Sequence, residues 1–194
     1  MALLPSGTRW SFGGGTCLAL RYGHRVSYDV DLFITDAQLI PYMVPRLNDD
    51  VAALVGYDVV ENSASLKVIL PHGDIDVIVG AVLTQPGVTE VEFANAAIPA
   101  QTAEEVLAKK MEYRGHAFTH RDAFDLAMLL ERDPARVATA EEACSDVRLV
   151  LLRQRLDLLL PRLTEELPIF VNPTEAGAPL MTRAASIIRT WLDT

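Results

Sequence analysis

The sequence predicts an α+β fold: a mixed sheet flanked by helices, followed by a C-terminal helical bundle. Residues 1–100 hold short apolar runs bounded by turn-forming residues, the pattern of strands with a few helices between them. Residues 101–194 hold only helical patterns with capping residues. The chain has 194 residues, half of them hydrophobic, which is enough to bury a sizeable core. We therefore expect a mixed core over residues 1–100 and a helical region over residues 101–194 that completes any active site.

The first elements lie within Phe12–Phe33, FGGGTCLALRYGHRVSYDVDLF. A strand near residues 9–12 ends in Gly13–Gly15, where glycine allows a turn with positive φ and a close approach to a ligand. A short helix from Thr16 to Tyr22 follows, and its unpaired N–H groups and positive dipole end favour a phosphate. This order predicts a phosphate cradle at the start of the helix.

Two aspartates mark the next strand. Side chains two apart in a strand point to the same face, so Asp29 and Asp31 can converge on one divalent cation. Arg25 and Ser27 precede them at even spacing and would add a cation and a hydroxyl on the same side. A phosphate cradle beside paired carboxylates suits the transfer of a phosphoryl or nucleotidyl group. Taken separately, a glycine run is also typical of a flexible turn, and paired aspartates of a solvated strand edge.

The rest of the first half is predicted from caps and turns. Thr35 or Asp36 caps a surface helix that runs to about Leu47. Strands are expected over residues 57–60, 65–70 and 75–79, and an edge hairpin over residues 91–100. The strand over residues 75–79 is apolar except for Asp76, which is either a salt-bridged strand residue or a site residue.

The second half is predicted to be helical throughout. Capping boxes of Thr102 with Glu105 and of Thr119 with Asp122 open two helices, which end at Gly115 and before Pro134. Further helices are expected over residues 140–144, 145–160 and 179–192.

The two capped helices carry a second group of charged residues. Asp122 and Asp125 share one helix face, and Lys110 on the preceding helix can meet them. A lysine held beside a carboxylate is placed to contact a nucleotide triphosphate, and Lys109 takes this role if the register is shifted by one. Asp122 is equally explained as a capping residue, and Asp125 as a surface partner of Arg121.

Composition restricts the classes of function. The formal net charge of −9 argues against binding nucleic acid through bulk electrostatics, although a local basic groove remains compatible with it. Cys17 and Cys144 lie far apart and are expected to be reduced core residues. The start, MALLPSGTRW, lacks the features of a signal peptide, and no apolar run is long enough to span a membrane. We expect a soluble cytoplasmic protein that does not act at a membrane.

Two motifs resemble one known family. The pattern GGTxLAL, a glycine and then RxSxDxDLF is similar to the first motif of the nucleotidyltransferase superfamily, in its AbiEii/AbiGii-type toxin branch, which includes the MenT toxins. The stretch AKKMEYRGHAFTHRDAFDL is similar to the later family pattern of a lysine, a spaced arginine and RDxxDL. The motifs cover about the first 130 residues, and the remainder matches only in helical character.

The resemblance implies a polymerase-beta-like nucleotidyltransferase core that transfers NMP from an NTP to an acceptor. It implies magnesium or manganese held by Asp29, Asp31 and a third carboxylate on a neighbouring strand, for which Asp76 fits better than Asp74. It further implies catalytic roles for Asp29, Asp31, Lys110 and Asp122. The triphosphate would lie on Gly14, Gly15 and Thr16, assisted by Arg25 and Ser27. The implied biological role is that of a toxin in a toxin–antitoxin or phage-defence system, with tRNA as acceptor and a cognate antitoxin as partner.

Three other functions stay open at this point. The acceptor could be a protein hydroxyl or a small molecule such as an antibiotic, which the acidic balance slightly favours. The chain could be a catalytically silent binding module of the same fold, although no motif residue is substituted. A purely structural helical scaffold would leave the carboxylates within apolar strands unexplained.

Overall fold

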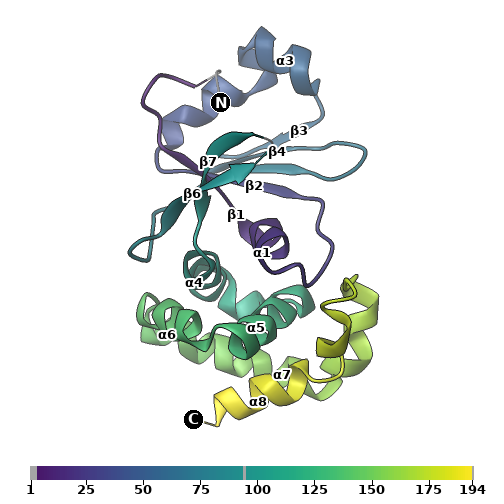
Figure 1. The fold of residues 1–194 in the computed structure, drawn as a ribbon. Helices are drawn as coiled ribbons and strands as arrows, with labels where there is room; N and C mark the ends of the chain where they lie inside the picture. The colour runs from purple at the N-terminus through teal and green to yellow at the C-terminus, as the bar shows by residue number, and fades with distance from the viewer. Residues whose placement is uncertain (1–3, 94, 194) are drawn as a thin grey trace.

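The computed structural model describes residues 4–93 and 95–193 of the chain. The expectation about a signal sequence falls partly on residues 1–3, outside this part. A seven-stranded sheet, in the order β3-β4-β5-β2-β1-β7-β6, has helices on both faces, and the C-terminal helices form a bundle beside one of them (Figure 1). The strands are β1 (Trp10–Gly13), β2 (Val30–Ile34), β3 (Val59–Glu61), β4 (Ser65–Val68), β5 (Ile75–Val79), β6 (Val88–Phe93) and β7 (Ala96–Gln101).

The sheet is mixed, and its register defines where the site lies. Strand β2 pairs antiparallel with β1 and parallel with β5. Asp31 of β2 is therefore opposite Gly13 of β1 on one side and opposite Asp76 of β5 on the other. Lys67 of β4 in turn lies opposite Asp76. The glycine turn and three charged side chains thus meet across neighbouring strands.

A helix of nine residues, α1 (Gly14–Tyr22), follows β1 directly and begins two residues earlier than predicted. Gly13 is its N-cap residue, and of the three glycines only Gly14 has a positive φ, of 66°. The helix ends at Gly23, whose φ of 60° is the left-handed conformation common at helix C-termini. It lies between the sheet and the helical bundle (Figure 1).

The predicted continuous surface helix from Thr35 or Asp36 to Leu47 is wrong, although Asp36 does cap the first short piece by accepting from Gln38 N. Three short pieces replace it: η1 (Ala37–Leu39), α2 (Ile40–Met43) and η2 (Pro45–Leu47). Proline has no N–H and restricts the residue before it, and Val44 before Pro45 is extended at φ −83° and ψ 121°. A further helix, α3 (Asp49–Val55), was not predicted, although Asn48 caps it by accepting from two backbone N–H groups.

Five α-helices and two short 3₁₀ turns make up the described part of the second half. They are α4 (Ala103–Arg114), η3 (Gly115–Ala117), α5 (His120–Arg132), α6 (Pro134–Glu142), α7 (Asp146–Phe170), η4 (Ala178–Leu180) and α8 (Ala184–Leu192). Three boundaries differ from prediction. Helix α6 begins six residues early, with Pro134 in its first turn, and α8 begins only at Ala184. Helix α7 continues through Pro161 and Pro168 to Phe170, because the buried leucines on either side of Pro161, Leu160 and Leu163, hold it in place.

One apolar core joins the two halves of the chain. Phe12, Leu18 and Ala100 from the sheet side belong to the same buried cluster as residues of α4 to α8. A smaller cluster, which includes Ile34, lies on the other face of the sheet, under α2. Among the described residues, no helix combines the length and apolar character needed to cross a membrane.

Candidate active site

A cavity of about 480 Å³ opens where α1, β2 and β5 meet α4 and α5. Every site residue predicted from the sequence lines it except Gly14. These lining residues are Gly15, Thr16, Arg25, Ser27, Asp29, Asp31, Asp76, Lys110 and Asp122.

The glycine turn is needed for close approach of side chains from elsewhere in the site. A Cβ on Gly14 would overlap the carboxylate of Asp31, and a Cβ on Gly15 would overlap the guanidinium of Arg25. The two glycines therefore let α1 begin directly against the charged groups. The N-terminal N–H groups of α1 have no helical partners, which makes this end suited to an anion.

Asp31 and Asp76 form the acidic centre of the site. They lie opposite each other on parallel strands, as the prediction of a third carboxylate on a neighbouring strand required. Burial, and then the negative charge of Asp76, raise the pKa of Asp31 to about 6. Two carboxylates that repel each other at the floor of a cavity are stabilised by a cation.

Asp29 and Lys67 complete the surroundings of that pair. Asp29 lines the same cavity, and its Oδ1 accepts from the N–H of Asp74 at 3.3 Å. Lys67 Nζ lies 2.7 Å from Asp76 and 3.1 Å from Asp74. Lys67 thus pairs with both aspartates, but of the two only Asp76 lines the cavity. The role of Asp76 as the third carboxylate stays a prediction.

The donor set fits a hard divalent cation in kind, because three aspartates line one cavity: Asp31 in β2, Asp76 in β5, and Asp29, which lies just before β2 and not within the strand as expected. The residues do not form a closed metal site as they stand: within the described ranges, no group of three or more acidic, histidine or cysteine side chains is already arranged to hold an ion. Lys67 already neutralises Asp76.

Thr16 and Ser27 fix the loop that leads into β2. Thr16 Oγ1 lies 2.7 Å from Ser27 Oγ and also donates to the backbone oxygen of Asp29. The first turn of α1 is thereby attached to the segment that carries Asp29. The two hydroxyls predicted to assist phosphate binding also define the shape of the site.

Asp125 is a fully buried centre of charge. Its Oδ1 accepts from Arg25 Nε at 2.7 Å and lies 2.7 Å from His24 Nε2, and its Oδ2 accepts from Arg25 Nη2 at 3.0 Å and from Lys110 Nζ at 2.7 Å. Burial alone would raise the pKa of Asp125, but Lys110, His24 and Arg25 outweigh it and hold that pKa far below its usual range. The interpretation of Asp125 as a surface partner of Arg121 is therefore wrong.

Lys110, not Lys109, points into the cavity. Its Nζ donates to Asp122 at 2.6 Å as well as to Asp125. Burial would lower the pKa of Lys110, but the two carboxylates raise it, so the amine is held as a cation. Asp122 also closes the predicted capping box, since its Oδ2 accepts from Thr119 N at 3.0 Å. Asp122 thus both caps α5 and binds Lys110, and its catalytic role stays a prediction.

Several residues near the site were missed or undervalued in the sequence. Lys67 could have been noticed from strand alternation, because it shares one face of β4 with the polar Ser65. The structure places it opposite Asp76. His24, which is fully buried against Asp125, gives no sequence signal of its own. Arg121 was assigned to the wrong partner: its Nη1 lies 4.0 Å from Asp29 Oδ2, and its Nε donates to the carbonyl of Phe170 at 3.0 Å.

The architecture is that of the nucleotidyltransferase fold. JHP933 from Helicobacter pylori is similar, with a TM-score of 0.50 at 14% identity over 96% of this chain and 86% of that one. MenT4, a nucleotidyltransferase toxin from Mycobacterium tuberculosis H37Rv, has the same TM-score and identity over 96% of this chain and 76% of that one. At this identity the likeness extends to the fold alone.

The family is established by the sequence. The family model described as "Nucleotidyl transferase AbiEii toxin, Type IV TA system" matches residues 1–170. The chain belongs to this family of toxin nucleotidyltransferases. No curated protein matches its sequence.

Proposed function

We propose that the protein transfers NMP from an NTP to the 3′ end of tRNA, in a reaction that requires Mg²⁺ or Mn²⁺. The observation that carries this proposal is the register of β2 against β5, which sets Asp31 beside Asp76 in front of the α1 N-terminus. Lys110 lies close enough to lower the pKa of Asp31 by its charge. The pair of carboxylates, the N-terminus of α1 and the lysine are the groups that nucleotidyl transfer requires.

Each residue has a definite task in this proposal. The free N–H groups of Gly15 and Thr16 bind the β- and γ-phosphates, and Arg25 and Ser27 border the same space. Lys110, fixed by Asp122 and Asp125, contacts the triphosphate from the side of the helical bundle. Arg114, half-exposed at 3.4 Å from Asp122, is available to the departing pyrophosphate.

Asp29, Asp31 and Asp76 are the residues that would hold the cation. When bound, it would neutralise the phosphate charge and the pyrophosphate that leaves. The acceptor hydroxyl attacks the α-phosphate, the bond from the α-phosphorus to the bridging oxygen of the β-phosphate breaks, and the acceptor gains NMP as pyrophosphate departs. The hydroxyl proton passes to solvent.

Incubation with each labelled NTP, magnesium and total tRNA tests this proposal. The control is Asp31→Asn, which removes one carboxylate and keeps the side-chain size. Label should appear on tRNA with the natural protein and fall by at least about a hundredfold with the variant, since one transition-state contact of this kind contributes ~3 kcal/mol or more. Label on no acceptor, or equal labelling by Asp31→Asn, would refute the assignment.

The biological setting is part of the proposal. Membership of a family described by its role in type IV toxin–antitoxin systems supports a cognate antitoxin as partner. We place the reaction in the cytoplasm, where tRNA and NTPs are present.

A further inference from the structure

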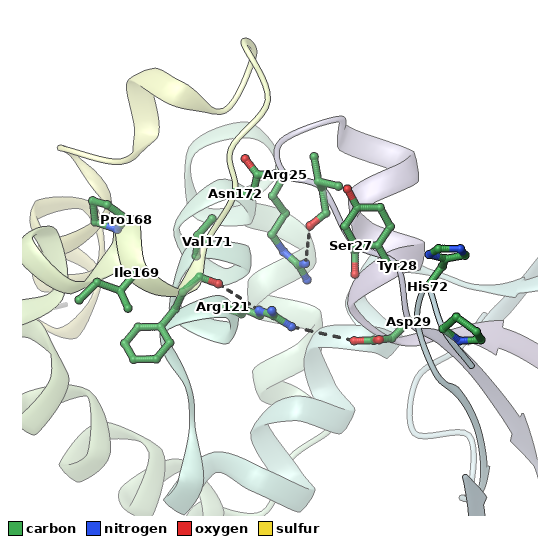
Figure 2. Close-up of a pocket in the computed structure, with 14 residues that line it drawn as sticks. Arg25, Ser27, Tyr28, Asp29, His72, Arg121, Pro168, Ile169, Val171 and Asn172 are labelled. Atoms are coloured by element: carbon green, nitrogen blue, oxygen red, sulfur yellow. Dashed lines mark hydrogen bonds and ion pairs between the residues drawn. The ribbon is translucent and has the colours of Figure 1, made fainter. Parts of the chain in front are cut away.

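A second and larger cavity, of about 910 Å³, adjoins the candidate active site. We call it the outer groove. The segment Arg25–Asp29 and the turn Pro71–Gly73 form one wall, and Pro168–Asn172 at the end of α7 forms the other (Figure 2). Its volume is at the upper end of the about 300–1,000 Å³ typical of ligand sites. The tasks proposed above for the nucleotide use only the smaller cavity.

Backbone contacts fix the two walls relative to each other. Val26 N donates to Asn172 O at 2.9 Å, and Arg25 forms an isolated bridge with Pro173. The groove is therefore built into the fold, since the end of α7 is joined to the loop before β2.

Asp29 and Arg121 separate the outer groove from the active-site cavity. Both residues line both cavities. Figure 2 shows the Arg121 side chain reaching across the space between the walls, with contacts to the backbone of α7 on one side and to Asp29 on the other. A molecule in the outer groove would thus reach the reacting phosphate past Asp29.

The outer groove carries exposed rings. Tyr28 is 70% exposed and Phe170 is 47% exposed, and both line it. The ring of Phe170 is held in place by stacking on His120, with centroids 4.4 Å apart and planes at 14°. Fixed, accessible aromatic faces are the surfaces on which unpaired bases stack.

The groove presents one accessible guanidinium. Although the chain carries a net charge of −9, Arg25 and Arg121 line this groove, with Asp29 as the one carboxylate among its described lining residues. Asp125 neutralises Arg25, whereas Arg121 is over half exposed and contacts Asp29 only at 4.0 Å. A guanidinium has five N–H donors, so Arg121 keeps donors for a phosphate.

We infer that the outer groove is the acceptor seat, and that it holds the unpaired 3′ end of a nucleic acid by stacking on Tyr28 and Phe170 and by a phosphate contact to Arg121. This inference rests on the proposed function and adds the chemistry by which the acceptor is recognised. The observations favour nucleic acid over a protein acceptor because exposed rings and an accessible arginine occur together here.

Binding without NTP tests the inference separately from catalysis. The probe is a fluorescently labelled RNA hairpin with a short single-stranded 3′ extension, compared by anisotropy with the same hairpin ending blunt. The full chain should bind the extended hairpin more tightly. Tyr28→Ala should raise its Kd roughly five- to hundredfold. Arg121→Gln should lower the slope of log K against log salt by about 0.7.

Two matched variants control for surface changes elsewhere. Tyr57 is also 70% exposed, and Arg46, 61% exposed in its side chain against 57% for Arg121, also pairs with a carboxylate; neither lines the groove. Tyr57→Ala and Arg46→Gln should leave both Kd and salt slope unchanged.

The outcomes separate the two levels of the proposal. Equal binding of blunt and extended hairpins, or equal Kd for Tyr28→Ala and Tyr57→Ala, would overturn the acceptor seat while leaving NMP transfer to tRNA to its own assay. Transfer of NMP to a protein in place of RNA would overturn the choice of acceptor. If the protein binds the extended hairpin but transfers no NMP to any acceptor, the proposed reaction is contradicted and the acceptor seat is not.

Discussion

The most consequential single residue outside the predicted set is Asp125. It compensates the buried charges of Arg25 and Lys110, which come from opposite sides of the site, and it also binds His24. Burying charges of this kind is costly unless they are paired. Asp125 therefore acts as a positioning residue: it keeps Lys110 charged and aimed into the cavity without lining the cavity itself.

We expect Asp125→Asn to destabilise the protein by about 3–5 kcal/mol, because it leaves buried cations without their counter-charge. The matched control is Asp157→Asn, whose carboxylate is 60% exposed and 2.9 Å from Arg189, and which should change stability by less than about 1 kcal/mol. Urea unfolding followed by circular dichroism measures both. Equal effects of the two substitutions would disprove the role of Asp125.

For Asp31 we expect the opposite effect on stability. Because its folded-state pKa is about 6 against an ordinary 3.8, its charge opposes folding. Asp31→Asn should therefore stabilise the metal-free protein at pH 7.5, by up to about 3 kcal/mol. The gain is full above about pH 6, shrinks as the pH falls, and vanishes below about 3.8. Thermal unfolding in EDTA across this range checks it, and a pH-independent difference would contradict it.

At the level of single residues, the sequence predicted side chains that the structure brings to one cavity, although their roles stay predictions. Asp29 lines this cavity from a position just before β2, and helix spacing brings Asp122 and Asp125 together. The sequence did not reveal which partner each charge would meet. Asp125 and Arg121 are four apart on α5, yet Asp125 points into the core and Arg121 toward Asp29, because the packing of α5 against α1 and α7 decides their environment.

Among the elements, the turn between β1 and α1 is the most constrained. Gly14 and Gly23 lie just inside and just after α1, with φ of 66° and 60°. They differ in their surroundings: an added Cβ would overlap Asp31 at Gly14, but would meet nothing within 4 Å at Gly23. Both positions therefore favour glycine because of their positive φ. Of the two, only Gly14 also requires glycine because a Cβ would overlap a neighbouring side chain.

Gly23→Ala should cost about 1–2 kcal/mol for its left-handed backbone. Gly14→Ala should cost a further ~1–3 kcal/mol, because the Asp31 carboxylate has to move. Denaturant unfolding of the two variants gives the difference directly. If both variants lose the same stability, Gly14 is required only for its φ angle and not for the approach of Asp31.

Elements were predicted well where their signals were local. Threonine caps placed the starts of α4 and α5, and Gly115 ended α4. Prediction failed where tertiary packing overrode the local signal. The helix expected to end at residue 160 passes through Pro161, because Leu163 and Leu167 are buried in the core. Conversely, the helix expected after β2 is interrupted at Val44, which is extended before Pro45, although Ile40, Met43 and Val44 are buried.

For the whole molecule, the predicted class was confirmed: a mixed sheet with flanking helices and a C-terminal helical region. The division into residues 1–100 and 101–194 stays a prediction. Lys110, Asp122 and Asp125 come from the second region and meet Arg25 and Asp31 from the first at one cavity and one charge network. The candidate site therefore needs both regions.

The proposed reaction at this site predicts that the acceptor attacks the α-phosphorus of the nucleotide. Parallel reactions with α-labelled and γ-labelled NTP, magnesium and tRNA test it most directly, with Asp31→Asn as the inactive control. We expect label on tRNA from the α-labelled nucleotide only, and release of γ-label as pyrophosphate. Transfer of the γ-label to the acceptor, or α-labelling that persists in Asp31→Asn, would contradict a nucleotidyltransferase centred on the aspartates of β2 and β5.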